Sequence, residues 1–290
     1  MAEITAAKVK ELRERTGSGM MDCKKALAET NGDMEKAIDY LREKGLAKAA
    51  KKAERNASDG RIFYVIGNNG KLGAMIELNS ETDFVAKTDE FNDLGTKITA
   101  HLAAKEYATP AELLESVHES GSTINELVTG IIAKLGENIV LKRFARFDSV
   151  NGRAFCYIHS NYKVGALLEL EADDKAALDS EAFAELGHEI CMQIAAANPL
   201  YLVSEDVPED VLEREKAVYR QQLIDEGKPA DKVDKIIPGK LRKYYETTCL
   251  LEQEYIRDSD KKIKDLVAET GKKLGTKLTV RRFARFAIGE

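Results

Sequence analysis

The sequence predicts an α+β protein in which one structural unit occurs twice. The stretch at residues 60–66 reappears, with small changes, at residues 152–158. Apolar and β-branched residues on both sides of Asn68-Asn69-Gly70 indicate a β-hairpin, because Asn-Gly favours the turns that close hairpins. Apolar residues spaced three or four apart further along indicate helices. This order is typical of a sheet that carries helices on one face.

The two copies differ in length. They are related by a shift of 92 residues at their beginning and 139 at their end, so the second copy is 47 residues longer. The excess lies in residues 199–259, where two charged amphipathic helices flank a turn, and we expect an antiparallel helical hairpin, a coiled coil. Pro238 and Gly239 predict a kink or an interruption of its second helix. Duplicated residues should be scaffold, so residues that break the repeat are the candidates for function.

The N-terminal segment predicts a bundle of three short helices. Thr5 and Asp33 suit the N-caps of the first and third helices, and Gly17 suits the end of the first. The third helix is expected to end at Gly45. The predicted domains are residues 1–45, a basic helical or flexible linker at 46–59, a first core subdomain at 60–147, and a second at 152–290 that contains the hairpin insertion at 199–259.

The composition excludes several classes of protein. The net charge of −6 argues against a general nucleic-acid binder. No apolar run reaches the length of a membrane span, and the N-terminus has no secretory signal, so we expect a cytoplasmic protein without a membrane partner. Four cysteines without a CxxC motif predict free thiols in a reducing compartment: Cys23, Cys156, Cys191 and Cys249.

The sequence contains no motif for covalent catalysis. A P-loop, a dinucleotide-binding glycine motif, a nucleophile elbow and a zinc-protease motif are all missing, so neither an enzyme nor a cofactor is predicted. Cys156-x-x-His159 and His188-x-x-Cys191 look like two halves of a zinc site. The first half falls in a predicted strand, where residues three apart face opposite sides, so no metal is predicted.

One short segment breaks the repeat most clearly. The second copy has Asp174-Lys175-Ala176-Ala177 where the first has Thr82-Asp83-Phe84-Val85. One hypothesis is that Phe84 and Val85 fill core space left by other differences between the copies. The other is that Phe84 is an aromatic anchor presented to a partner, the kind of residue that dominates interface energies. Asp83 beside it could cap a helix or accept hydrogen bonds from a partner.

Two long motifs together resemble the bacterial elongation factor Ts family of translation factors. They are residues 82–87, Thr-Asp-Phe-Val-Ala-Lys, and residues 16–27, Thr-Gly-Ser-Gly-Met-Met-Asp-Cys-Lys-Lys-Ala-Leu. The resemblance covers essentially the whole chain and implies a guanine-nucleotide exchange factor that is not an enzyme. It would bind elongation factor Tu, displace the Mg²⁺ of that GTPase and promote GDP release, without binding nucleotide or nucleic acid itself.

The resemblance also implies roles for individual residues. The family's aromatic wedge and its neighbours match four residues here: Thr82, Asp83, Phe84 and Val85. The family's N-terminal, UBA-like bundle contacts the GTPase domain, which makes Leu12, Met20 and Met21 candidate contacts. His159, beside the second hairpin turn, matches a residue that contacts another domain of the partner. Some members carry a further C-terminal helix, and we expect this chain to lack it.

An alternative function is an RNA-binding accessory role in translation. Arginine and phenylalanine alternate in residues 142–147 and again in residues 281–286, as they do on surfaces that stack single-stranded RNA. The presence of the pattern in both copies favours a scaffold instead, with side chains on alternating faces of a strand.

Overall fold

The computed structural model describes residues 4–290, apart from the side chains of residues 230 and 231. Its mixture of helices and strands confirms the predicted α+β class. The chain divides into two compact units. The first comprises the chain up to Val65, Ala74–Arg146 and Phe286–Glu290; the second comprises Ile66–Gly73 and Phe147–Arg285. None of the helices in residues 4–290 combines the length and apolarity that a membrane span needs.

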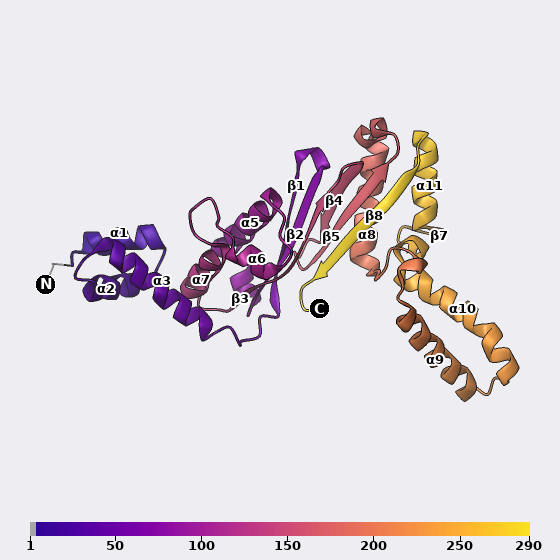
Figure 1. Ribbon diagram of the computed structural model, residues 1–290, viewed down its shortest axis with the longest axis horizontal. Coiled ribbons are helices and arrows are strands. Elements are labelled where there is room, and N and C mark those ends of the chain that lie inside the picture. The colour runs from indigo at the N-terminus through magenta and orange to yellow at the C-terminus, as the bar shows by residue number, and fades with distance from the viewer. Residues whose placement is uncertain (1–3) are drawn as a thin grey trace. The chain divides into compact units, whose positions relative to one another are not determined.

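Three helices open the first unit (Figure 1): α1 (Ala6–Thr16), α2 (Met20–Glu29) and α3 (Met34–Ala50). The side chains of Thr5 and Asp33 accept hydrogen bonds from the first turns of α1 and α3, and Gly17 ends α1 in a left-handed conformation. These caps confirm the predicted ends. The apolar faces meet in a small core: Val9, Leu12, Cys23, Ala26, Leu27 and Ala37.

The third helix does not end at Gly45, as the sequence predicts. It continues to Ala50, and Gly45 is buried inside it. A Cβ on Gly45 would lie 3.7 Å from the Cβ of Ala133, on a helix of the same unit. Gly45 packs against that helix, and residues 46–50 continue α3 beyond the predicted end.

The first sheet has the strand order β1-β2-β3, with β1 (Asp59–Gly67), β2 (Leu72–Ser80) and β3 (Ile139–Asp148). The predicted hairpin turn is confirmed: Asn68, Asn69 and Gly70 all have positive φ angles. Helices α5 (Asp89–Ala104), α6 (Pro110–Glu115) and α7 (Ile124–Leu135) share a core with the sheet. α6 ends at Glu115 because Ser116 is already extended.

The second sheet repeats this plan with the order β4-β5-β8: β4 (Gly152–Ile158), β5 (Val164–Ala172) and β8 (Leu278–Ala287). β4 and β5 are antiparallel, and Gly152 pairs with Glu171. Helices α8 (Glu181–Ala197) and α11 (Ile263–Leu274) contribute to its core. A short pair, β6 (Glu254–Tyr255) and β7 (Asp258–Lys262), precedes α11.

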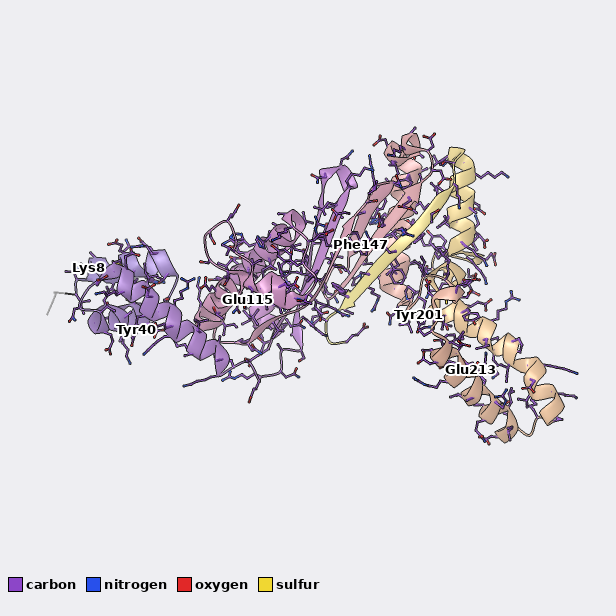
Figure 2. All side chains as sticks on the ribbon, in the orientation of Figure 1. Lys8, Tyr40, Glu115, Phe147, Tyr201 and Glu213 are labelled. Atoms are coloured by element: carbon purple, nitrogen blue, oxygen red, sulfur yellow. The ribbon has the colours of Figure 1, made fainter. Side chains whose placement is uncertain are left out.

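The excess residues of the second copy form α9 (Glu209–Asp225) and α10 (Ala230–Thr248), which run antiparallel in Figure 1. Leu223, Val233 and Ile237 are buried between them. Glu213, labelled on α9 in Figure 2, is exposed and forms an ion pair with Lys216, with Oε1 and Nζ 2.7 Å apart. The predicted interruption is wrong, since α10 continues through Pro238 as one helix.

Candidate functional site

The segment that breaks the repeat forms one helical turn directly after β2. Thr82 is the N-cap of α4 (Asp83–Ala86), because its side-chain oxygen accepts a hydrogen bond from the backbone N of Val85 at 3.4 Å. The hydroxyl of Ser80 donates to the carbonyl oxygen of Thr82 at 2.9 Å. Thr88 then caps α5. The turn is thus capped at both ends, which fixes its backbone between a strand and a long helix.

This turn sends neighbouring side chains to opposite sides. Val85 and Ala86 are buried in the core of the first unit, whereas Phe84 is 79% exposed. Successive helical residues point about 100° apart, so one turn can bury two side chains and leave the preceding one in solvent. The core-filling hypothesis is therefore wrong for Phe84 and right for Val85.

The second copy shows that the exposed position belongs to the repeat. Ala176, the counterpart of Phe84, is also exposed, while Ala177 and Leu178 are buried like Val85 and Ala86. The larger residue of the buried pair comes first in the first copy, as Val85, and second in the second copy, as Leu178. The scaffold therefore needs nothing at the outward position, and the phenylalanine of the first copy is available for another purpose.

Asp83 lies at the start of the turn and does not cap it. Its carboxylate forms an ion pair with the ammonium of Lys87, with Oδ2 and Nζ 2.6 Å apart. The cap is the preceding Thr82. Of the two roles considered for Asp83, helix capping is wrong because Thr82 already occupies the N-cap position; binding to a partner stays a prediction.

Sequence reasoning misses a residue that holds this turn, Glu137. Its Oε2 accepts the backbone N–H of Thr82 at 2.9 Å, and its Oε1 accepts the Thr82 hydroxyl at 2.7 Å. Asn138 beside it donates its backbone N–H to Glu81 Oε1 at 2.7 Å and its side-chain amide to the carbonyl of Arg55 at 2.9 Å. No short-range signal could reveal a contact over 55 residues.

The predicted contacts in the N-terminal bundle differ in accessibility. Met20 and Met21 open α2 and are 57% and 75% exposed. Leu12 is completely buried in the core of the bundle, so its prediction as a surface contact is wrong. Its position on α1 repeats the apolar spacing that builds the bundle, whereas its role as a contact is implied only by the family resemblance.

His159 belongs to the second unit and lies in the turn after β4. Its side chain is exposed, and its Nδ1 lies 3.1 Å from the hydroxyl oxygen of Tyr157. The backbone N–H of His159 donates to the carbonyl of Val164, and Tyr162 in the same turn has a positive φ of 60°. The turn therefore presents a histidine and a half-exposed tyrosine to solvent.

Among the described residues, the cysteines and histidines form neither a disulfide nor a metal-binding cluster. All four cysteines are free thiols, as predicted. Burial raises the pKa of the Cys156 and Cys191 thiols, which opposes thiolate formation. Within residues 4–290, no three His, Cys, Asp or Glu side chains whose placement is described gather in a way that could hold a metal ion.

The arginine–phenylalanine strands have a structural use. Arg143 Nε lies 2.5 Å from Glu77 Oε2, and Arg282 Nε lies 2.6 Å from Glu169 Oε2. Both carboxylates are buried, and so are Phe147 and Phe286. Side chains that satisfy buried charges inside the scaffold cannot also form a platform for RNA, so this alternative has no support in the structure.

Comparison with known proteins shows the family to which this chain belongs. Residues 81–290 match the family model described as elongation factor TS. The chain is 47% identical over 287 residues to elongation factor Ts of Clostridium botulinum strain Alaska E43, covering 99% of this chain and 93% of that protein. It is 45% identical over 289 residues to elongation factor Ts of Trichlorobacter lovleyi, with the same coverage. This chain therefore belongs to the elongation factor Ts family.

Proposed function

We propose that this chain is the guanine-nucleotide exchange factor of elongation factor Tu and promotes GDP release during translation elongation. The observation that carries the proposal is the exposed Phe84 on a doubly capped turn, in a chain that belongs to the elongation factor Ts family. Exchange of this kind requires no bond to be made or broken by the factor. The proposed place of action is the cytoplasm, where translation factors work.

In the proposed mechanism, Phe84 enters the nucleotide domain of the GTPase and disturbs the site of its Mg²⁺. Mg²⁺ bridges phosphate oxygens to the protein, so its loss removes a large part of the hold on GDP. Asp83 travels with the ring and can meet donors of the GTPase. By linkage, the factor weakens the nucleotide by the same free energy by which the nucleotide weakens the factor.

The size of the effect follows from burial. Phe84 is 79% exposed in the free protein, so most of its apolar surface is still available for burial in a partner. Complete burial of such a side chain contributes about 2 kcal/mol. Because 1.4 kcal/mol corresponds to a factor of ten, the ring alone accounts for about thirty-fold in exchange rate.

Other surfaces would share the contact. We propose that Met20 and Met21, on a UBA-like bundle formed by residues 1–45, contact the GTPase domain, and that His159 contacts another domain of the partner. Residues 46–59 then act as the linker, 60–147 and 152–290 as the two core subdomains, and 199–259 as a coiled-coil arm. Exposed methionines support this assignment because they adapt to irregular apolar surfaces.

The test is the release of a fluorescent GDP from elongation factor Tu with and without this chain. We expect Phe84→Ala to lower the second-order exchange rate about thirty-fold and to leave thermal stability unchanged, since the ring packs on little of its own protein. Val150→Ala is the matched control, because Val150 is a similarly exposed apolar residue (74%) outside the proposed surface. A wild-type chain that does not accelerate release contradicts the function, and a fully active Phe84→Ala contradicts the wedge.

A further inference from the structure

The carboxylate of Glu137 joins the turn that carries Phe84 to the end of α7. It accepts both polar hydrogens of Thr82, the backbone N–H at 2.9 Å and the hydroxyl at 2.7 Å. Thr82 is in turn the N-cap of α4. A single carboxylate thus fixes the residue from which the exposed turn begins, and both partners are half-buried, where such bonds are stronger than in water.

The second copy has an equivalent hydrogen bond that is made by a different side chain. Thr276, the counterpart of Glu137, accepts the backbone N–H of Asp174, the counterpart of Thr82, at 2.9 Å. Thr276 thus makes a single, uncharged hydrogen bond to the turn that carries Ala176, beside the backbone bond from Asp173 to the carbonyl oxygen of Lys277. The first copy adds a second bond and a charge at the place where the turn carries Phe84.

We propose that Glu137 is a positioning residue for nucleotide exchange, which holds the Phe84 turn in its inserting conformation before the partner arrives. This inference rests on the proposed function. A turn that is ordered beforehand loses less conformational entropy on insertion, so more of the binding free energy of the ring remains for distortion of the GTPase. Glu137 need not touch the partner, because it acts through Thr82 on the orientation of Phe84.

The test compares variants in fluorescent GDP release from elongation factor Tu. We expect Glu137→Ala to lower the exchange rate about tenfold, the size of one net hydrogen bond to a charged group. Glu137→Gln should stay within about twofold of wild type, because its amide oxygen can accept the Thr82 N–H and its NH₂ can donate to the hydroxyl. Thr276→Ala is the matched control. It removes the equivalent hydrogen bond of the second copy and should leave the rate of GDP release at the wild-type value.

A double variant separates positioning from a general loss of stability. If Glu137 acts through Phe84, then Glu137→Ala should cause no further loss in the Phe84→Ala background. An equal loss in both backgrounds overturns the proposal, as does a wild-type rate for Glu137→Ala. Failure of the proposed function itself is distinguishable, because the wild-type chain would then not accelerate release.

A second variant tests the same contact if Glu137→Ala does not fold. Thermal unfolding reports whether Glu137→Ala is folded at the assay temperature. If it is not, Glu137→Thr replaces it, since this substitution installs the residue that the second copy uses and keeps an acceptor for the backbone N–H. Its exchange rate is expected to lie between those of wild type and Phe84→Ala, and a wild-type rate overturns the proposal.

Discussion

The guanidinium of Arg143 lies over the ring of Phe286, with Cζ 4.6 Å from the ring centroid, and both residues belong to the first unit. Arg282 and Phe147 make the same contact within the second unit at 4.5 Å. Phe286 is the repeat counterpart of Phe147. Each unit therefore includes the last residues of the final strand of the other copy. Each stacked arginine also satisfies a buried glutamate, so one side chain serves both a ring and a charge.

Removal of Arg143 should therefore destabilise the protein far more than removal of its neighbour Lys142. Both contact Glu77, which is completely buried, but Arg143 also stacks on Phe286. We expect Arg143→Ala to lower the free energy of unfolding by about 3 kcal/mol, because it leaves a buried carboxylate poorly compensated. Lys142→Ala should cost less than about 1 kcal/mol. Urea unfolding of both variants measures the difference, and equal losses would count against the stacked pair.

A methyl group at Gly95 should not fit. A Cβ there would lie 2.3 Å from the ring of Phe63, which packs in the same core. We expect Gly95→Ala to cost about 2 kcal/mol as the ring is displaced. Gly130→Ala, on α7 of the same unit, meets nothing within 4 Å and should instead stabilise by up to about 1 kcal/mol. Thermal unfolding should separate the two; a stabilised Gly95→Ala would refute the packing argument.

Replacing Gly239 by alanine should stabilise the helical hairpin. It lies within α10, and a Cβ at this position would meet open space. Gly239→Ala should stabilise the helix by about 0.5–1 kcal/mol, which corresponds to roughly two- to fivefold slower amide hydrogen exchange along α10. Gly227→Ala is the control, because Gly227 has a φ of +75° and alanine there should speed exchange. Unchanged amide hydrogen exchange in Gly239→Ala would mean that another position limits the opening of α10.

His101 should make stability depend on pH. Burial lowers its pKa below the ordinary value of 6.5, and the nearby His118 and Lys105 lower it further, against the opposing charge of Glu119. The unfolded chain then binds the proton more tightly than the folded one, so stability is lost as pH falls below about 6.5. His101→Gln should flatten this part of the profile. Thermal unfolding between pH 5 and pH 8 tests it, and an unchanged slope would exclude His101 as the source.

The sequence alone determined the local elements of this protein. Caps at Thr5 and Asp33, the hairpin turn at residues 68–70 and the apolar spacing of the helices are all set by neighbouring residues, and all agree with the structure. The internal duplication added a comparison within one chain. It singled out Phe84 as a residue that the scaffold does not share.

Tertiary structure alone decided which residues are accessible and which long-range partners hold them. Gly45 fits a helix end, and the family resemblance implies a surface contact at Leu12, yet both residues are buried by packing between helices. Glu137 reaches Thr82 across 55 residues. Periodicity and capping report interactions within a few residues along the chain, whereas burial and distant hydrogen bonds depend on how the chain folds back on itself.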